Sequence, residues 1–304
     1  MKNIFWRLQA FLFYILTLVA SLVPEPIAYR YGSLAGLLIP YIVPKRQAIS
    51  IDNISQSLLF MKSHLLWNSL CNDPRTLAHE IFRNLGRSLM EISRLYQGRG
   101  ENIISNIEVR GWENYETAKA KGKGIIFFSG HCGNWELMSL ALSNLFGETV
   151  SGVARQQNNP FFNKMVEKMR SRYNSKLIYK HGALKGILSA LKKCEMVGIL
   201  ADQAVRPEEG CLIKFIGRTA WASRMPAVIA RKTGAPLIPV FIHRDREHHV
   251  LTFYPEHVFT GTADDDGINE DTQDLSRYIE NYVVAHPTQW YWIHRRWKRA
   301  GICI

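Results

Sequence analysis

The stretch GIIFFSGHCGNWELMSLALSNLF (residues 124–146) decides the fold of this chain. It opens with a short, continuous apolar run, GIIFF, of the length expected for a buried strand. It ends in WELMSLALSNLF, which is long enough for a helix, and a turn with two glycines and a histidine joins the two. A buried strand that turns directly into a helix is typical of domains in which strands and helices alternate. The segment therefore predicts an α/β domain.

The rest of the chain continues this alternation. Further strands are predicted at 150–154, 177–179, 196–201, 237–242 and 249–254, and further helices at 159–174, 183–194, 223–234 and 272–286. Strands that alternate with helices imply a mostly parallel central sheet flanked by helices. In such sheets the functional site lies beyond the carboxyl ends of the strands, which here means directly after Phe128, Ala154 and Ala201.

The composition excludes several classes of protein. Of 304 residues, 47% are hydrophobic, which is enough apolar surface to exclude a mainly disordered chain. The mean hydropathy of −0.12 excludes a polytopic membrane protein. Lysine and arginine number 38 and aspartate and glutamate 26, and the net charge of +12 indicates an acidic partner. Nucleic acid, an anionic membrane, and an acidic protein or substrate all fit that description.

The five cysteines do not form a recognisable framework. Their number is odd and no two stand in a Cys-x-x-Cys pair. This argues against a set of disulfides and against a zinc ribbon, and it favours a reducing compartment.

The N-terminal region contains the apolar run AFLFYILTLVASLV (10–23), fourteen residues without a charge. A perpendicular membrane span needs about 20 apolar residues, although Lys2 and Arg7 can reach toward the headgroups. A cleaved signal peptide, a buried core helix and a membrane anchor all fit the run. Because unpaired cysteines do not suit export, we expect a transmembrane or interfacial anchor over residues 1–25. The next stretch, 27–46, is apolar and aromatic and then basic, which suits the headgroup level.

Residues 26–106 are expected to form a membrane-proximal helical segment. Within it, Leu77, Ile81 and Leu85 begin an apolar stripe at helical spacing. Such a stripe indicates a helix packed against the main domain, which begins at about residue 107.

His131 and Glu136 are the strongest candidates for chemistry. Their spacing would place them on different sides of a regular helix, so they can meet only if His131 lies in the turn and Glu136 in the first helical turn. Gly130 and Gly133 allow such a turn, and Asn134 is a good N-cap. A carboxylate behind an imidazole fixes its tautomer and makes it a general base near neutral pH. On its own, the pattern is more often a structural histidine in a glycine turn.

Six segments together favour a catalytic role for His131 over a structural one. SGHCGNWE (129–136) resembles the catalytic signature of the bacterial lipid A late acyltransferases, the lauroyl and myristoyl transferases, within the larger glycerolipid acyltransferase group. The resemblance continues in the family's order through segments 48–58, 152–174, 201–223, 230–241 and 286–298. Each segment is modestly specific, whereas the six in order are strongly so.

The resemblance implies a fold like that of the glycerol-3-phosphate acyltransferases, with 107–304 as the catalytic domain. An acyl carrier protein thioester would donate a fatty acyl chain to a hydroxyl of lipid A or its precursor. His131 would deprotonate that hydroxyl, and Glu136 would orient His131. The enzyme would act at the bacterial inner membrane with its catalytic domain on the cytoplasmic side. The residues leave open another glycolipid or phospholipid acceptor, acyl-CoA as the donor, and a thioesterase that uses water.

The same resemblance supplies candidates for substrate binding: Arg155, Asn159, Arg170, Asp202 and Gln203. Arg155 would stabilise the tetrahedral oxyanion or bind a lipid phosphate. Asp202 ends a predicted strand at the active edge of the sheet, where it could hold Arg155, bind a sugar hydroxyl or cap a turn. Gln203 shares that segment, and Asn159 and Arg170 match the family more loosely.

Other reactive side chains are given no catalytic role. Neighbours in a turn point in different directions, so Cys132 is not expected to act as a nucleophile beside His131. The histidines His243, His248 and His249 lie in a predicted hairpin, beside arginines that would repel a metal ion.

Two charged runs remain. The aspartates Asp264, Asp265 and Asp266 are expected to form a solvated loop. The chain ends in a basic cluster with flanking tryptophans: Trp292, Arg295, Arg296, Trp297, Lys298 and Arg299. Such a mixture suits an anionic membrane surface, at roughly 1 kcal/mol per basic residue.

Two kinds of partner are not expected. The basic residues are not organised as a nucleic-acid recognition module, so nucleic acid is not an expected partner. No metal or nucleotide cofactor is implied, since the sequence contains neither Gly-x-x-x-x-Gly-Lys nor Gly-x-Gly-x-x-Gly.

Overall fold

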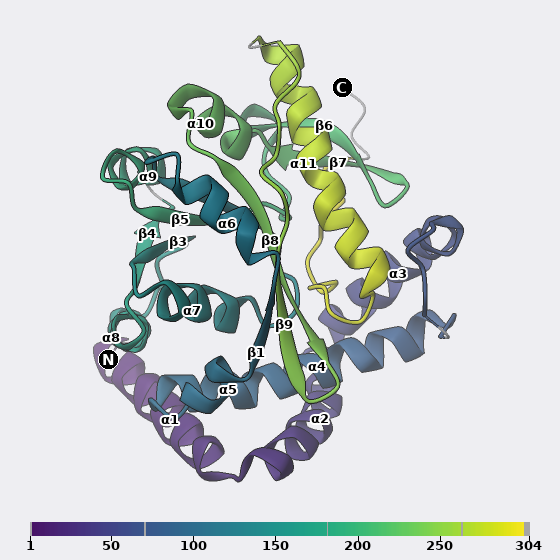
Figure 1. The fold of residues 1–304 in the computed structure, drawn as a ribbon. Coiled ribbons are helices and arrows are strands. Elements are labelled where there is room, and N and C mark those ends of the chain that lie inside the picture. The colour runs from purple at the N-terminus through teal and green to yellow at the C-terminus, as the bar shows by residue number, and fades with distance from the viewer. Residues whose placement is uncertain (1, 70, 181, 263, 301–304) are drawn as a thin grey trace.

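The computed structural model describes residues 2–69, 71–180, 182–262 and 264–300. Within them, a central sheet of seven strands has the order β1-β9-β8-β2-β5-β3-β4 and is flanked by helices (Figure 1). Its strands are β1 (Ile107–Arg110), β2 (Ile125–Ser129), β3 (Val150–Ala154), β4 (Ser175–Tyr179), β5 (Met196–Leu200), β8 (Leu237–Asp245) and β9 (His248–Phe253). Strands β8 and β9 pair antiparallel, and the other pairings described in this sheet are parallel. The mostly parallel α/β sheet predicted from the sequence is therefore confirmed.

A short hairpin of β6 (Gly210–Phe215) and β7 (Arg218–Ser223) lies outside this sheet. The helices are α1 (Lys2–Leu22), α2 (Glu25–Ile42), α3 (Pro44–Ser63), α4 (Pro74–Tyr96), α5 (Glu101–Ser105), α6 (Trp112–Lys119), α7 (Trp135–Phe146), α8 (Pro160–Arg172), α9 (Ala183–Lys192), α10 (Met225–Thr233) and α11 (Asp265–Ala285). All the strands and helices predicted after residue 124 occur. Most of their ends lie within a few residues of the predicted ends.

The hydrophobic core lies on both faces of the sheet. Strand β2 is therefore buried along its whole length. Successive side chains of a strand point to opposite faces. Accordingly, Ile126 and Phe128 belong to one hydrophobic cluster, whereas Ile125 and Phe127 belong to the other. A continuous apolar run is thus what a central parallel strand between two layers of helices requires.

The prediction of a loop at the three aspartates is wrong. Asp264 accepts a hydrogen bond from the amide of Gly267 at 2.9 Å and is the N-cap of α11. Asp265 and Asp266 form the first turn of that helix, where the helix dipole favours negative charge. The last helix therefore starts at Asp265 instead of residue 272. Strand β1 and the β6–β7 hairpin were not predicted.

The C-terminal tryptophans are core residues, which contradicts their predicted place at a membrane surface. Trp292 is 0% exposed and Trp297 is 6% exposed. Arg296 is buried with them, donates to the carbonyl of Trp221 and lies 5.1 Å over the ring of Phe215. Helix α3 holds this segment in place, since Asn53 donates to the backbone carbonyls of Trp292 and His294.

Helices α1 and α2 form a V along the outer side of α4 (Figure 1). Among the described residues, α1 is the helix that is long and apolar enough to cross a membrane, with a mean hydropathy of 1.6. Cys71, Cys132, Cys194 and Cys211 are free thiols, and Cys303 lies outside the described residues.

Candidate active site

The glycine turn after β2 places His131 at the carboxyl edge of the sheet, as predicted. Gly133 has a φ of +54°, which favours glycine, and Asn134 accepts from the amide of Leu137 at 3.1 Å and caps α7. A Cβ on Gly130 would lie 3.2 Å from the side chain of Asp202. The turn thus brings the backbone close to a carboxylate that follows the neighbouring strand β5.

Asp202 holds His131 through two hydrogen bonds. Its Oδ1 lies 2.7 Å from Nδ1 of His131, and its Oδ2 accepts from the backbone amide of His131 at 2.9 Å. The indole Nε1 of Trp290 donates to the same Oδ2 at 2.8 Å. The sequence assigned the orienting carboxylate to Glu136, but the structure gives that contact to Asp202.

Register explains this pairing. β2 and β5 are parallel neighbours in which Ser129 lies opposite Leu200. His131 and Asp202 each follow two residues later, so both leave the sheet at the same point.

The electrostatics favour a protonated Nδ1 and an ionised carboxylate. Burial lowers the pKa of His131, but the charge and hydrogen bond of Asp202 outweigh it, so the pKa lies above its usual value. The charge of Glu136 contributes in the same direction. Burial raises the pKa of Asp202, but the charge and hydrogen bonds of His131 lower it to about 2. The Nδ1 tautomer therefore leaves the lone pair of His131 on Nε2.

Nε2 of His131 faces Gln203, whose side-chain Nε2 lies 3.2 Å away. The imidazole lies beside two aromatic rings that contact each other, with centroid distances of 5.1 Å to Trp135 and 5.9 Å to Tyr291. The predicted site residue Gln203 therefore contacts His131 directly.

Glu136 points to Arg170 instead of the imidazole. Nη2 of Arg170 donates to Oε2 of Glu136 at 2.5 Å, and its Nη1 donates to Oγ of Ser139 at 2.9 Å. Arg170 is 6% exposed, so this arginine sits beneath α7 and fixes the side chain of Glu136 beside the site.

Arg155 and Asn159 have different surroundings. Arg155 follows β3 at the active edge and is exposed, as its predicted role with an anionic group requires. Asn159 caps α8, accepting from Phe161 and Phe162, and donates to the backbone carbonyl of Trp6 in α1. Asn159 therefore has a structural role here, and its contact with substrate stays a prediction.

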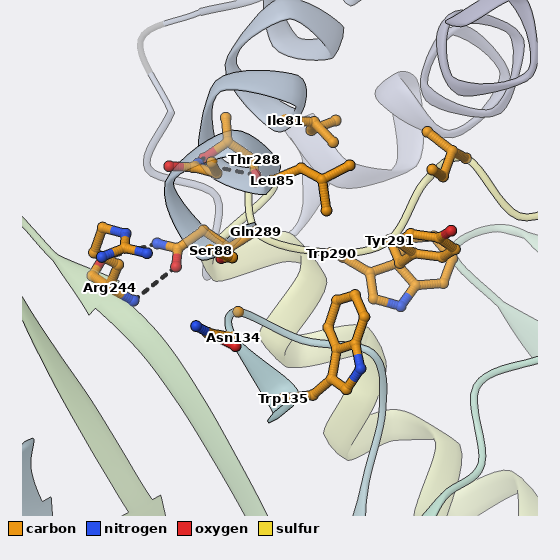
Figure 2. A pocket seen from close by; sticks show the side chains of 13 residues that line it. Ile81, Leu85, Ser88, Asn134, Trp135, Arg244, Thr288, Gln289, Trp290 and Tyr291 are labelled. Atoms are coloured by element: carbon orange, nitrogen blue, oxygen red, sulfur yellow. Dashed lines mark hydrogen bonds between the residues drawn. The ribbon is translucent and has the colours of Figure 1, made fainter. Parts of the chain in front are cut away.

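A pocket opens beside the catalytic turn, with an empty volume of about 460 Å³. Its apolar lining consists of Ile81, Leu85, Trp135, Trp290, Tyr291 and Ile293, and its polar lining includes Asn84, Ser88, Asn134, Arg244, Thr288 and Gln289. Figure 2 shows Trp135 and the C-terminal aromatic residues facing Leu85 across the pocket, with Arg244 at the other end. Trp135 and Tyr291 line this pocket and also flank His131, so the pocket adjoins the base.

A buried charge network, which sequence reasoning missed, supports this region. Glu91 of α4 pairs with Nη2 of Arg244 at 2.8 Å and with Nε2 of His249 at 3.0 Å. The side chain of Asn134 donates to Oε2 of Glu91 at 2.8 Å. Burial raises the pKa of Glu91, but the charges and hydrogen bonds of His249 and Arg244 hold it well below its usual range. The network ties α4 and the β8–β9 hairpin to the cap of α7.

The site offers neither a thiol nucleophile nor a metal centre in the described part of the chain. Cys132 is buried, and burial raises the pKa of its thiol well above the usual value, which disfavours the thiolate. Among the residues that the structure describes, no three His, Cys, Asp or Glu side chains gather as metal ligands. What the site offers is a general base: a histidine oriented by a buried carboxylate, with an apolar pocket beside it.

These features define an α/β protein with a paired histidine and carboxylate next to a largely apolar pocket. The family of bacterial lipid A biosynthesis acyltransferases matches residues 4–299, so the chain belongs to that family and is an acyltransferase. It is 26% identical to the lipid A biosynthesis lauroyltransferase of Escherichia coli K12, over 93% of this chain and 89% of that protein.

Two other relatives name different acyl chains or acceptors. The chain is 22% identical to the lipid A biosynthesis palmitoleoyltransferase of Escherichia coli K12, over 92% of this chain and 87% of that protein. It is 21% identical to the phosphatidylinositol mannoside acyltransferase of Mycobacterium tuberculosis CDC 1551, over 74% of this chain and 71% of that protein.

Proposed function

We propose that this chain is a membrane-associated O-acyltransferase that moves a fatty acyl chain from an acyl carrier protein thioester to a hydroxyl of lipid A or its precursor. Family membership and the names of the relatives support the acyl transfer and the acceptor. The observation that carries the mechanism is the 2.7 Å contact between Nδ1 of His131 and Oδ1 of Asp202. The proposal places the catalytic domain on the cytoplasmic side of a bacterial inner membrane.

In this mechanism Asp202 keeps the proton of His131 on Nδ1, and Nε2 removes the proton of the acceptor hydroxyl. The hydroxyl oxygen attacks the thioester carbonyl and a tetrahedral oxyanion forms. The carbon–sulfur bond then breaks, and the imidazolium returns the proton to the leaving sulfur. The negative charges of Asp202 and Glu136 both stabilise the transient imidazolium. No covalent acyl-enzyme is needed, because both substrates are held together.

Two polar side chains are assigned to the substrates. Gln203 lies 3.2 Å from the nitrogen that must receive the proton, so an incoming hydroxyl displaces its amide. Once displaced, that amide is still beside the reacting carbon and can donate to the oxyanion. Arg155, exposed at the end of β3, is assigned to a phosphate of the acceptor. Arg170 acts through Glu136 as a positioning residue.

The pocket beside His131 is assigned to the acyl chain. Its aromatic and aliphatic lining is typical of a site for an apolar ligand. Trp135 both lines it and flanks the imidazole, so a chain bound there has its thioester carbonyl next to the base.

The direct test is acyl transfer from lauroyl acyl carrier protein to a lipid A precursor, measured with purified full-length protein. His131→Ala should lower the rate by about 10² to 10⁴, the usual contribution of a general base. His248→Ala is the matched control, since His248 is half-buried and pairs with Glu108 on β1, away from the catalytic turn. Fatty acid release that does not need an acceptor would identify a thioesterase instead, and a fully active His131→Ala variant would refute the mechanism.

A second candidate is an acyltransferase for another glycolipid or phospholipid, with acyl-CoA or acyl carrier protein as donor. The similarity to a phosphatidylinositol mannoside acyltransferase supports this second candidate. Mass spectrometry of lipids from a deletion strain separates the two. Loss of one acyl chain from lipid A supports the first candidate, and an unchanged lipid A profile with an altered glycolipid supports the second.

A further inference from the structure

Helix α1 buries and exposes its side chains in the opposite way to a helix on the surface of a water-soluble protein. Its buried residues are the small or polar Ala10, Thr17 and Ser21. Large apolar side chains point outward, and Leu16 is 68% exposed. In water the larger apolar residues would face inward, because their burial provides the driving force for packing. The outward face of α1 is therefore suited to lipid.

Helix α2 repeats this reversal. Its outward face is a continuous stripe at helical spacing, formed by Ile27, Tyr31, Leu34, Leu38 and Tyr41, all of which are exposed. Its inward face consists of small residues and Pro40. This stripe lies on a helix that sequence reasoning assigned only to the headgroup region.

The contact between α2 and α4 also resembles helix packing in membranes. A Cβ on Gly36 would lie 2.2 Å from the carbonyl oxygen of Phe82, and one on Gly86 would lie 2.1 Å from that of Gly32. Small residues four apart that allow backbones to meet are typical of helix pairs in lipid, where apolar burial does not drive association. Helix α2 is thus fastened to α4 by its glycines and presents its large side chains outward.

Helix α1 is fastened at both ends by polar contacts, to the start of α8 and to the end of α4. Near its start, the carbonyl of Trp6 accepts from Asn159 of α8 at 2.9 Å. Near its end, Oγ1 of Thr17 accepts from Gln97 at 2.8 Å, and Arg94 donates to the carbonyl of Val23 at 2.7 Å. At about 1.5 Å per residue, a helix of this length matches the thickness of the hydrocarbon layer. If α1 crossed a bilayer, it would take these polar groups of α4 and α8 into the hydrocarbon.

The charges on the V formed by α1 and α2 are mostly positive. Residues 2–42 contain three basic side chains, Lys2, Arg7 and Arg30, and one acidic one, Glu25. Glu25 is paired with Arg94 at 3.1 Å, so it does not offset the basic residues. A positive, outward-facing apolar surface matches a leaflet that contains anionic lipid.

We propose that α1 and α2 together dock the protein into one leaflet of an anionic bilayer, and that α1 does not cross it. This deepens the membrane association proposed above. Helix α4 carries α2 on one side and contributes Ile81 and Leu85 to the pocket, so the pocket lies directly behind the docked surface. A lipid acceptor and an acyl chain would then reach His131 from the leaflet itself.

The first test measures flotation of the full-length protein with vesicles of phosphatidylethanolamine and phosphatidylglycerol. The double variant Leu34→Asp/Leu38→Asp on α2 should lower vesicle binding about tenfold or more, because charged groups on a lipid-facing surface are costly. Leu184→Asp is the matched control, since Leu184 is 51% exposed on α9, away from α1 and α2 (Figure 1). An α2 variant that binds as well as the wild type would overturn the docking role of α2.

The second test asks whether α1 crosses the bilayer. Membrane vesicles containing Asn3→Cys protein are treated with an impermeant maleimide, and Cys194, which is exposed, serves as the internal reference. We expect both thiols to react from the same side. Reaction of residue 3 from the opposite side would show a span. A detergent-free dimer that does not bind vesicles would show that a second copy covers this surface, and would also overturn the proposal. Neither test uses the acyl-transfer reaction, so the docking and the activity can fail separately.

Discussion

Nε1 of Trp290 donates to Oδ2 of Asp202 at 2.8 Å, so the C-terminal segment contacts the carboxylate that holds His131. Trp290 also lines the pocket beside the base. The segment is itself held by α3, since Asn53 donates to the carbonyls of Trp292 and His294 at 2.9 Å each. A region that resembled a membrane-facing tail in the sequence is therefore part of the candidate active site.

Trp290→Phe should lower kcat by about tenfold, because a hydrogen bond to a charged group contributes about 1.5–3 kcal/mol. Trp292→Phe is the matched control: Trp292 is also buried, and its Nε1 donates to the carbonyl of Pro287 at 2.8 Å. Both variants should lower the melting temperature, but Trp290→Phe alone should lower kcat strongly. Equal losses of kcat in steady-state assays would show that the effect is structural and does not pass through Asp202.

Asp202→Asn should lower kcat by about 10² to 10⁴, since an amide can neither fix the productive tautomer nor stabilise the imidazolium. The wild-type rate should fall at low pH as His131 becomes protonated, with a midpoint above the ordinary pKa of a histidine. Removing the charge of Asp202 should move that acid limb to lower pH. Glu136→Gln should move it in the same direction by less, because the charge of Glu136 is the smallest contribution. A rate–pH profile whose acid limb stays in place in Asp202→Asn would contradict the proposed role of this carboxylate.

The local parts of the site could be predicted from the sequence. The apolar run of β2, the glycines of the turn and the N-cap at Asn134 depend on neighbouring residues, and the structure confirms each of them. The carboxylate that orients His131 could not be predicted in the same way. Glu136 is near in sequence, but α7 directs it to Arg170, whereas Asp202 becomes the neighbour of His131 through the register of β2 and β5.

The partners of the buried charged residues could not be predicted from the sequence either. Glu91, Arg244 and His249 come from a helix and from two strands far along the chain, so no short pattern links them. Arg296 looks like a surface cation in the sequence, yet burial lowers its pKa to about 10. Alternation and capping follow from local chemistry, whereas the partners of buried charges follow from how the sheet and helices pack.

Glu91→Gln should destabilise the protein by about 3–5 kcal/mol, because it leaves the buried charge of Arg244 without its partner. Glu108→Gln is the control, since Glu108 pairs with Arg110 on the surface, where solvent screens the pair and its loss changes stability little. The folded-state pKa of Glu91 is depressed, so its contribution is present above the ordinary glutamate pKa and is lost as pH falls. Urea unfolding at neutral and acidic pH measures both effects. Similar losses in the two variants at neutral pH would contradict the assignment of Glu91 as a buried support.

Gly133→Ala tests whether the shape of the catalytic turn matters beyond stability. A Cβ at this position would lie 2.2 Å from the carbonyl oxygen of Ile242, and φ is +54°, so the turn that carries His131 must move. Gly147→Ala provides the comparison, because Gly147 ends α7 with a φ of +62° and a Cβ there would meet nothing within 4 Å. Both variants should lose about 1–2 kcal/mol of stability from the left-handed backbone. Gly133→Ala should also lose about 10² or more in kcat, since a shift of about 1 Å in a catalytic group has that effect. Thermal unfolding together with single-turnover assays separates the two contributions, and equal kcat values in the two variants would show that the turn tolerates the displacement.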